Sequence, residues 1–181
     1  MKGIIFNLVE EFVTTNWGEE KYEQILGKCP LQTKEPFVGP GTYPDADLMT
    51  IVGKSAEALG VSVPDALRAF GKFCFPKLAE KFPNFTNPYK HPKEFLKTID
   101  SVIHVEVRKL MKGADTPKFV FQDSGPNRLI MEYESKRQLC PLVEGMFDGV
   151  GDFFKSPIQH NQTKCSLKSG TVCQFDLTFT A

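Results

Sequence analysis

Hydrophobic residues recur every three or four positions through the first two thirds of the chain, which is the spacing of one face of an α-helix. This spacing predicts helices over four ranges: 4–26 with a break at Gly18, 45–59, 64–82 and 93–112. Asp45 is suited to begin the second of these helices as its N-cap, and Gly60 is suited to end it. Clusters of proline and glycine predict loops at 30–44 and 83–92.

In the last third of the chain, polar and apolar residues alternate instead. The alternation predicts strands over 118–122 and 128–135, joined by a turn at 124–127. Helical spacing returns over 136–155, and a second stretch of alternation predicts a last strand over 171–180. We therefore expect an α+β fold, with a mostly helical N-terminal part followed by an antiparallel sheet with helices.

Length and charge narrow the class of protein. The 181 residues are enough for one well-packed domain over 1–181 and too few for two. Basic and acidic residues balance at 22 each, so we expect no nucleic-acid partner. No apolar run approaches the roughly 18 residues of a membrane span. The first residues, MKGIIFNLVEEFV, contain no signal-peptide cleavage site, so we expect a cytoplasmic protein.

His104 lies in the middle of the clearest predicted helix, between Val102, Ile103, Val105 and Val107. A neutral imidazole can bind iron through one ring nitrogen while the other nitrogen donates a hydrogen bond. A single histidine on such a face is more often a half-buried side chain whose polar atoms are satisfied within the protein. Taken alone, His104 therefore favours the ordinary structural interpretation.

Three hydrogen-bond donors alternate at the end of the second predicted strand: Tyr133, Ser135 and Arg137. Side chains two residues apart in a strand point to the same face, so a phenol, a hydroxyl and a guanidinium would line up. Such a row can bind carboxylates, because a guanidinium pairs with a carboxylate through two hydrogen bonds. The alternative is the polar face of an edge strand.

Four segments occur together in one order: MKGIIFN at the N-terminus, IDSVIHVEVRKL at 99–110, the turn at 112–117, and Tyr133-Glu-Ser-Lys-Arg137. Jointly they resemble the H-NOX family, haem domains that bind nitric oxide or oxygen and are related to the haem domain of soluble guanylate cyclase. The resemblance covers essentially the whole chain and is to the stand-alone bacterial members.

The resemblance implies a role for each matched residue. His104 would be the proximal ligand of the iron of a b-type haem, and Tyr133, Ser135 and Arg137 would bind the haem propionates. Pro117 and Ile5 would pack against the haem and bend it. The family fold would place the haem between a distal helical subdomain, 1–60, and a haem-carrying subdomain, 61–181.

The resemblance also indicates which gas is bound. Oxygen-binding members carry a tyrosine donor five residues after the motif arginine, a position that is Leu142 here. The other matched positions of the distal pocket offer no strong donor: Val9, Leu67, Cys74, Leu78 and Met146. Nitric oxide binds ferrous haem tightly without a donor, whereas stable oxygen binding needs one. We therefore expect nitric oxide and carbon monoxide to bind and oxygen to be excluded.

A second metal site is indicated by three of the five cysteines. Cys140, Cys165 and Cys173 lie in the C-terminal half with His160 nearby, and three thiolates and an imidazole could hold a tetrahedral Zn²⁺. Some bacterial H-NOX proteins resemble this chain in carrying such a cluster. The histidine is the weaker member of the set because its loop would have to fold back. Scattered reduced thiols remain the alternative.

The expected function is that of a sensor and not of an enzyme. Nitric oxide would weaken the iron–His104 bond, and release of His104 would shift its helix and change the surface that a partner reads. Family resemblance suggests a histidine kinase or a cyclic-di-GMP enzyme in a separate chain as that partner. The alternatives are a cysteine- and zinc-based redox sensor that also binds haem, and a haem oxygenase or peroxidase. An enzyme of this kind needs an acid–base side chain on the distal side of the haem, and the matched distal positions are apolar.

Overall fold

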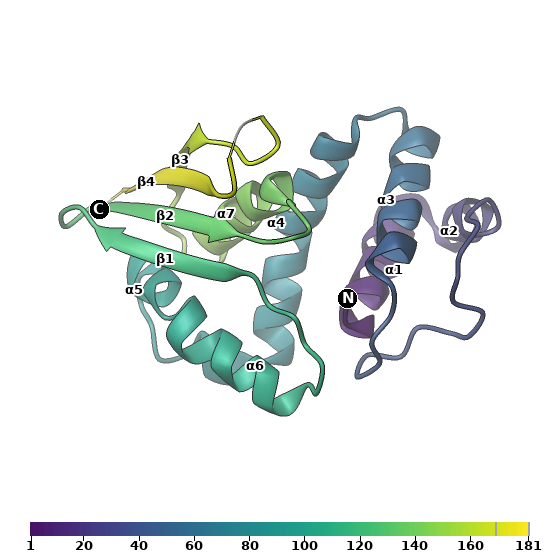
Figure 1. Ribbon diagram of the computed structural model, residues 1–181, viewed down its shortest axis with the longest axis horizontal. Coiled ribbons are helices and arrows are strands. Elements are labelled where there is room, and N and C mark those ends of the chain that lie inside the picture. Colours follow the sequence, from purple (N-terminus) through teal and green to yellow (C-terminus); the bar gives the residue numbers. More distant parts are fainter. Residues whose placement is uncertain (169, 181) are drawn as a thin grey trace.

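The computed structural model describes residues 1–168 and 170–180. Three helices form the N-terminal part: α1 (Gly3–Trp17), α2 (Glu19–Leu26) and α3 (Asp45–Leu59). The 19-residue helix α4 (Val63–Lys81) then passes between these helices and the rest of the molecule, as Figure 1 shows. The Ser62 hydroxyl caps α4 by accepting a hydrogen bond from the Asp65 amide, and Gly60 ends α3 with φ 68°, as predicted.

The predicted helix over 93–112 is divided into three segments in the structure. These are α5 (Pro92–Lys97), a π-helical turn η2 (Ile99–Ile103) and α6 (His104–Leu110), preceded by a short 3₁₀ turn, η1 (Pro83–Phe85). The Thr98 carbonyl accepts from the amides of both Val102 and Ile103, at 2.9 and 3.2 Å, so the turn holds one residue more than an α-helical turn. Such turns often occur at functional sites, and this one directly precedes His104.

A four-stranded antiparallel sheet forms the C-terminal part, in the order β1-β2-β4-β3. Its strands are β1 (Lys118–Asp123), β2 (Arg128–Glu134), β3 (Ile158–Lys164) and β4 (Cys173–Phe179). The expected α+β fold is confirmed, with its helical N-terminal part and its antiparallel sheet. Strand β3 was missed because its sequence, IQHNQTK, is polar at nearly every position, as an edge strand can be.

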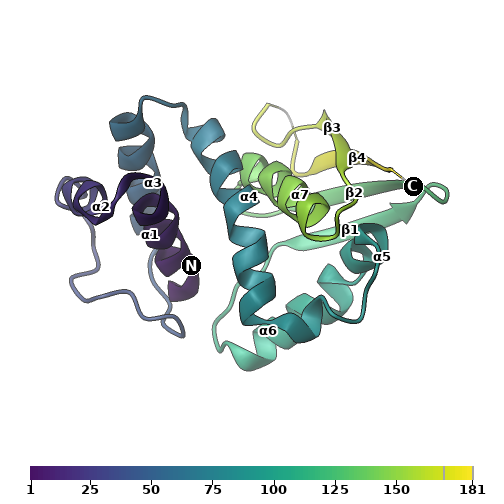
Figure 2. The same cartoon turned by 180° about the vertical axis from the view of Figure 1, so that it is seen from behind.

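Helix α7 (Cys140–Phe153) connects β2 to β3 and packs closely along α4, which Figure 2 shows from behind. Glycines on both helices allow this approach. A side chain at Gly145 would collide with the Arg68 carbonyl, and one at Gly71 would collide with the Leu142 carbonyl. The two helices therefore touch backbone to backbone.

The buried apolar residues form two clusters that meet along α4 and α7. The N-terminal cluster joins α1, α2, α3 and one face of α4, and the C-terminal cluster joins the sheet with α5 and α7. Met146 of α7 packs against both clusters. Within residues 1–168 and 170–180, no helix combines the length and apolarity needed to cross a membrane.

Candidate functional site

His104 begins α6 and lies in a largely buried position. Its side chain is 14% exposed, and its ring stacks on that of Phe119 of β1 with centroids 5.5 Å apart. Its Nδ1 atom lies 3.6 Å from a carboxylate oxygen of Asp100 in the π-helical turn. This buried nitrogen makes no hydrogen bond with good geometry in the described part of the chain. The imidazole therefore has coordinating capacity that the protein does not use.

The surroundings of His104 favour its neutral form. Burial is the largest influence and lowers the pKa of the imidazole, and the positive charge of Arg108 acts in the same direction. The carboxylate of Asp100 and the carbonyl of Pro117 oppose this shift without cancelling it. A neutral imidazole keeps a ring nitrogen lone pair available, which is the form in which histidine binds iron.

A row of aromatic rings joins His104 to the tyrosine of the predicted carboxylate clamp. Phe119 lies between them, with ring centroids 5.5 Å from His104 and 5.5 Å from Tyr133. The phenol oxygen of Tyr133 accepts a hydrogen bond from the Leu139 amide at 3.2 Å. Burial raises the pKa of Tyr133, so the phenol keeps its proton as a donor. Strand pairing of β1 with β2 thus brings two distant sequence motifs together.

The prediction that strand alternation aligns the three clamp residues is wrong. Strand β2 ends at Glu134, and Ser135 and Arg137 lie in the turn that follows. The turn is closed locally, because the Ser135 hydroxyl accepts from the Arg137 amide at 3.2 Å. The Ser135 side chain acts on Tyr133 by lowering the pKa of its phenol, against the larger effect of burial. The residues are therefore neighbours through a turn and not through a shared strand face.

Arg137 reaches across to the N-terminal helices. Its Nε atom lies 2.7 Å from a carboxylate oxygen of Asp45, and its other guanidinium nitrogens contact the carbonyl and carboxylate of Asp115 at 2.8 and 3.3 Å. Burial alone would raise the pKa of Asp45, but hydrogen bonds from the N-terminal amine and Arg137 hold it below its ordinary value. Asp45 is the first residue of α3 and makes no capping hydrogen bond, contrary to its predicted role.

Pro117 and Ile5 come from different parts of the chain, the segment before β1 and helix α1. Pro117 is half-buried, and its carbonyl faces the His104 imidazole. Ile5 is half-buried on α1 and packs against the N-terminal cluster. The segment before Pro117 is tied to the same end of α1, because the Lys2 ammonium donates to the Lys112 carbonyl at 3.2 Å.

The residues predicted for the distal pocket come from α1, α4 and α7 and lie in or against the N-terminal cluster. Val9 and Cys74 are buried in it, and Leu78, Leu142 and Met146 are half-buried and pack on it. Burial, with a smaller contribution from the charge of Glu11, raises the pKa of the Cys74 thiol to about 12. The thiol is therefore neutral at physiological pH, and this set of side chains is apolar.

These features together fit a haem. The chain offers a buried neutral imidazole with an unpaired ring nitrogen, and phenol, hydroxyl and guanidinium donors that suit carboxylates. The donors lie at the end of the aromatic row that starts at His104. The apolar side chains predicted for the distal pocket would surround the rest of the haem.

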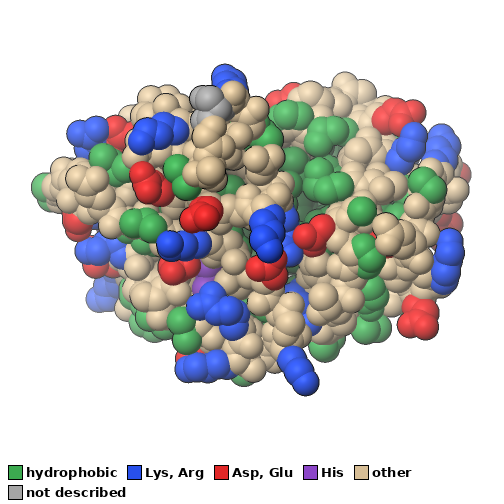
Figure 3. Space-filling model, viewed as in Figure 1, with side chains coloured by type: hydrophobic (Ala, Val, Ile, Leu, Met, Phe, Trp, Pro, Cys, Tyr) green, Lys and Arg blue, Asp and Glu red, His purple; other side chains and the backbone are tan. Residues whose placement is uncertain are grey.

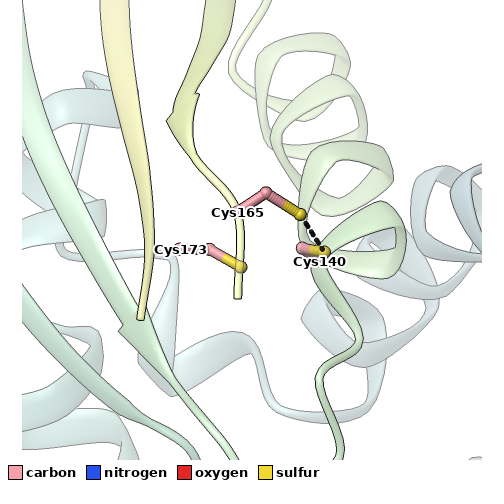
Figure 4. A group of neighbouring side chains, drawn as sticks. All are labelled: Cys140, Cys165 and Cys173. Atoms are coloured by element: carbon pink, nitrogen blue, oxygen red, sulfur yellow. Dashed lines mark hydrogen bonds between the residues drawn. The ribbon is translucent and has the colours of Figure 1, made fainter. Parts of the chain in front are cut away.

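The thiols of Cys140, Cys165 and Cys173 meet at the start of α7, the end of β3 and the start of β4 (Figure 4). Their sulfur atoms all lie within 4.8 Å of one another. Burial raises the pKa of Cys140 to about 12. Burial acts in the same direction on Cys165, but hydrogen bonds from nearby backbone amides and from Cys140 hold its pKa below the ordinary value. The predicted grouping of the three cysteines is therefore present.

His160 does not join the thiols, and its assignment as the fourth zinc ligand is wrong. Its ring is buried against Phe147, with Nε2 3.0 Å from an Asp148 carboxylate oxygen and Nδ1 3.7 Å from Glu144. Strand β3 is the reason, because it pairs His160 with Leu177, well along the strand from the cysteines. A polar edge strand was not predicted, so the position of His160 could not be either.

Comparison with known proteins decides the family. The profile of the haem-NO-binding family matches residues 2–162. The chain belongs to this family. Among solved structures, the H-NOX protein of S. oneidensis in its Fe(II)NO state is 28% identical, covers 100% of both chains and has a TM-score of 0.94.

Other relatives extend the comparison. An unliganded Fe(II) H-NOX protein of K. algicida is 28% identical, with a TM-score of 0.91, and the match covers 100% of this chain and 97% of that one. The IWP-051-bound H-NOX of Shewanella woodyi is 33% identical over 99% and 95% of the two chains, with a TM-score of 0.86. Soluble guanylate cyclase gcy-37 of Caenorhabditis elegans is 29% identical over 149 residues, and the match spans only 20% of that protein.

Several contributors to the site were not predicted. Phe119 links the two motifs, and Asp45, Asp100 and Asp115 face Arg137 or His104. Phe119 stands in a predicted strand next to Pro117, but nothing in its spacing shows that it faces a histidine. Asp45 and Asp115 are distant in sequence from Arg137, so only the fold brings them to it. Asp100, by contrast, lies four residues before His104 and is its neighbour along the helix.

Proposed function

We propose that this H-NOX chain is a gas sensor that binds nitric oxide and carbon monoxide at a ferrous b-type haem and excludes oxygen. The observation that carries the proposal is the buried imidazole of His104, whose Nδ1 makes no well-formed hydrogen bond in the described part of the chain. A ferrous haem held there would supply an open coordination site for a diatomic gas. His104 is the iron ligand in this proposal.

The propionate clamp consists of Tyr133, Ser135 and Arg137. In the structure the Arg137 guanidinium is paired with Asp45 and Asp115, so it already lies among carboxylates at a partly buried position. Propionates of the haem are carboxylates of the same kind, and a guanidinium binds them through paired hydrogen bonds. Pro117 and Ile5 would pack against the haem and bend it.

Gas selectivity follows from the apolar distal side. Leu142, Leu78, Val9 and Met146 have no hydrogen-bond donor in their side chains, and the neutral thiol of Cys74 donates only weakly. A bound oxygen molecule carries partial negative charge that needs a donor, whereas nitric oxide does not. These residues therefore favour nitric oxide and carbon monoxide over oxygen.

Signalling would pass through the helix that carries His104. Release of the imidazole would free α6 and its π-helical turn, which are tethered to the sheet by the Asp100 contact to the Phe119 amide at 3.2 Å. The altered surface would be read by a separate chain, a histidine kinase or a cyclic-di-GMP enzyme, in the cytoplasm. Charges of both signs are interspersed on the face in Figure 3, so this face gives no electrostatic reason to propose a nucleic-acid partner.

Absorption spectra of the purified protein test the proposal. A haem spectrum that changes with nitric oxide and carbon monoxide, and stays unchanged in air after reduction, is expected. His104→Gly should lose haem unless imidazole is supplied, whereas Ser101→Ala in the same segment should retain it. A colourless protein after expression with ample haem would refute the proposal, and unchanged haem content in His104→Gly would refute the ligand assignment.

The thiol cluster supports a second candidate function, a zinc- or redox-linked sensor. Cys140, Cys165 and Cys173 offer three sulfur ligands within 4.8 Å of one another, and three thiolates with a fourth ligand from solvent or another group can hold Zn²⁺. Metal analysis of the purified protein tests this candidate. About one zinc per chain, lost in Cys165→Ala and retained in Cys29→Ala, is expected, and zinc-free protein prepared with zinc present would overturn it.

A further inference from the structure

Lys2 is a buried lysine, 8% exposed, that forms no ion pair with a carboxylate in the described part of the chain. Its ammonium donates instead to three neutral oxygens: the Pro40 carbonyl, the Thr42 hydroxyl at 2.9 Å and the Lys112 carbonyl at 3.2 Å. Burying a charge without an opposite charge is costly, and these charge-assisted hydrogen bonds offset the cost. Such an arrangement calls for an explanation.

Two of the three oxygens belong to the loop before α3, which forms one unit with the start of α1. Lys2 pairs with Thr42 in an isolated antiparallel bridge, and the Gly3 amide donates to the Gly41 carbonyl at 2.9 Å. Pro40 and Thr42 are therefore fixed to the beginning of α1 by backbone hydrogen bonds as well as by the ammonium.

The third oxygen belongs to the turn after α6. Helix α6 begins at His104 and ends at Leu110, and Lys112 follows two residues later. The Met111 amide donates to the Val107 carbonyl at 2.8 Å, so the turn is a direct continuation of the helix. Figures 1 and 2 both show this turn beside the loop before α3. Lys2 thus joins the end of the helix that carries the proposed iron ligand to the start of α1.

We propose that Lys2 is a positioning residue that passes a displacement of α6 to the start of α1. Helices at such contacts shift by about 1–2 Å in ligand-driven transitions. The ammonium is shielded from water, which strengthens its hydrogen bond to the Lys112 carbonyl, so a shift of α6 pulls on Lys2. Helix α1 carries Ile5 and Val9, so the displacement reaches residues assigned to the haem edge and the distal side. The cause of the displacement rests on the proposed function, whereas the link itself does not.

Arg137 also joins the two parts of the molecule, but its link has a different character. Its guanidinium contacts Asp45 of α3 and Asp115 of the segment after α6. Haem propionates would compete with these carboxylates for the guanidinium. The partners of Lys2 are neutral oxygens with which no propionate competes, so the Lys2 link persists when haem is bound.

Amide hydrogen exchange measured by mass spectrometry tests the link without any gas. Lys2→Met keeps a long unbranched side chain but removes all three hydrogen bonds. In segments 38–43 and 111–117, the amides of Gly41 and Ala114 each donate to a backbone carbonyl at 2.9 Å. Both segments of the purified, reduced variant should exchange at least about tenfold faster than in wild type, the value of one hydrogen bond from a charged group.

Lys34→Met is the matched control. Lys34 lies in the same loop between α2 and α3, but its ammonium donates to the Leu31 carbonyl at 3.0 Å and so stays within that loop. Its removal should change exchange in neither segment. Thr42→Val removes one loop partner of Lys2 and leaves the bond to Lys112, so exchange should rise over 38–43 alone.

Nitric oxide then tests transmission along the link. In wild type it should change exchange over 111–117 and over 3–9, the start of α1. In Lys2→Met the change over 111–117 should remain and the change over 3–9 should be lost, whereas Lys34→Met and Thr42→Val should respond as wild type.

Two results with Lys2→Met would overturn the proposal: faster exchange confined to 38–43, or a response of 3–9 to nitric oxide that equals that of wild type. A wild-type response confined to 111–117 would overturn it as well, and this result needs no variant. If wild type does not respond to nitric oxide anywhere, the proposed function fails, and the experiment without gas alone decides whether Lys2 forms the link.

Discussion

At the scale of single residues, His104 shows how much depends on neighbours that are distant in sequence. Its position on a helix was predictable, and its resemblance to a haem ligand was visible from the motifs around it. Its burial and its ring stacking on Phe119 were not, because they depend on how β1 packs against the helical segment that carries the histidine. The spacing of apolar residues shows which face of a helix or strand is buried. It does not show which two side chains will pack against each other.

Leu142 gives a residue-scale prediction about oxygen. Leu142→Tyr would place a phenol among the apolar distal side chains, where it can donate to a partly negative bound oxygen molecule. We expect measurable oxygen affinity in absorption spectra of the reduced variant in air. Leu142→Phe, which adds the ring without the hydroxyl, is the control and should show none. Equal behaviour of the two variants, with the fold intact, would show that Leu142 does not face the bound gas.

At the scale of elements, the close contact of α4 with α7 depends on glycines. Gly145→Ala would push its methyl group into the Arg68 carbonyl and force the helices apart. We expect the free energy of unfolding to fall by about 1–3 kcal/mol in denaturant titrations. Gly53→Ala in α3 is the matched control, because its methyl would meet no atom of the described residues within 4 Å, and it should stabilise the protein by about 0.5–1 kcal/mol. Equal effects would contradict this explanation of the helix contact.

A second element-scale prediction concerns the loop between α2 and α3. Asp47 is 2% exposed and accepts hydrogen bonds from the amides of Gln32 and Thr33 and from the Thr33 hydroxyl, at 2.6 to 2.9 Å. Burial alone would raise its pKa, but these bonds lower it below the ordinary value. Its stabilising effect is therefore complete above the unfolded-state pKa, near 3.9, and is lost as pH falls through the lower folded pKa.

Asp47→Asn should consequently cost about 1–3 kcal/mol of unfolding free energy at neutral pH. The difference from wild type should shrink below about pH 4, where the carboxylate binds a proton first in the unfolded chain and, at still lower pH, in the folded protein. Asp152→Asn, which removes one partner of an exposed ion pair with Lys72, is the control and should change little at any pH. A destabilisation by Asp47→Asn that does not vary with pH would show that the charge of the carboxylate is unimportant.

Most elements could be predicted from periodicity, and the exceptions have physical causes. The helices and the strands β1, β2 and β4 carry regular apolar spacing, whereas β3 lies at a sheet edge and needs no apolar face. Its absence from the prediction also misplaced His160, which pairs with Asp148 and not with the thiols. The contact of Arg137 with Asp45 was missed because the turn after β2 redirects the guanidinium toward α3.

At the scale of the whole molecule, two apolar clusters meet along α4 and α7, and the proposed haem lies where they approach each other. A group that binds the folded state alone stabilises it by mass action. Haem present at about a thousand times its dissociation constant should raise the melting temperature of a chain of this size by roughly 8–16 °C. Calorimetry of haem-loaded and haem-free protein measures the difference, with His104→Gly as the comparison, and identical melting temperatures would contradict binding between the clusters.

The π-helical turn before His104 has a consequence for how relatives are aligned. Because the turn holds one residue more than an α-helical turn, it is equivalent to a single insertion that the helix absorbs without interruption. Deletion of one residue between Ile99 and Ile103 would convert the π-helical turn into an ordinary α-helical turn and leave the flanking residues on the same faces of the helix. A one-residue gap at this point among homologues would therefore mark the loss of the π-helical turn, with the histidine still on the same face of the helix.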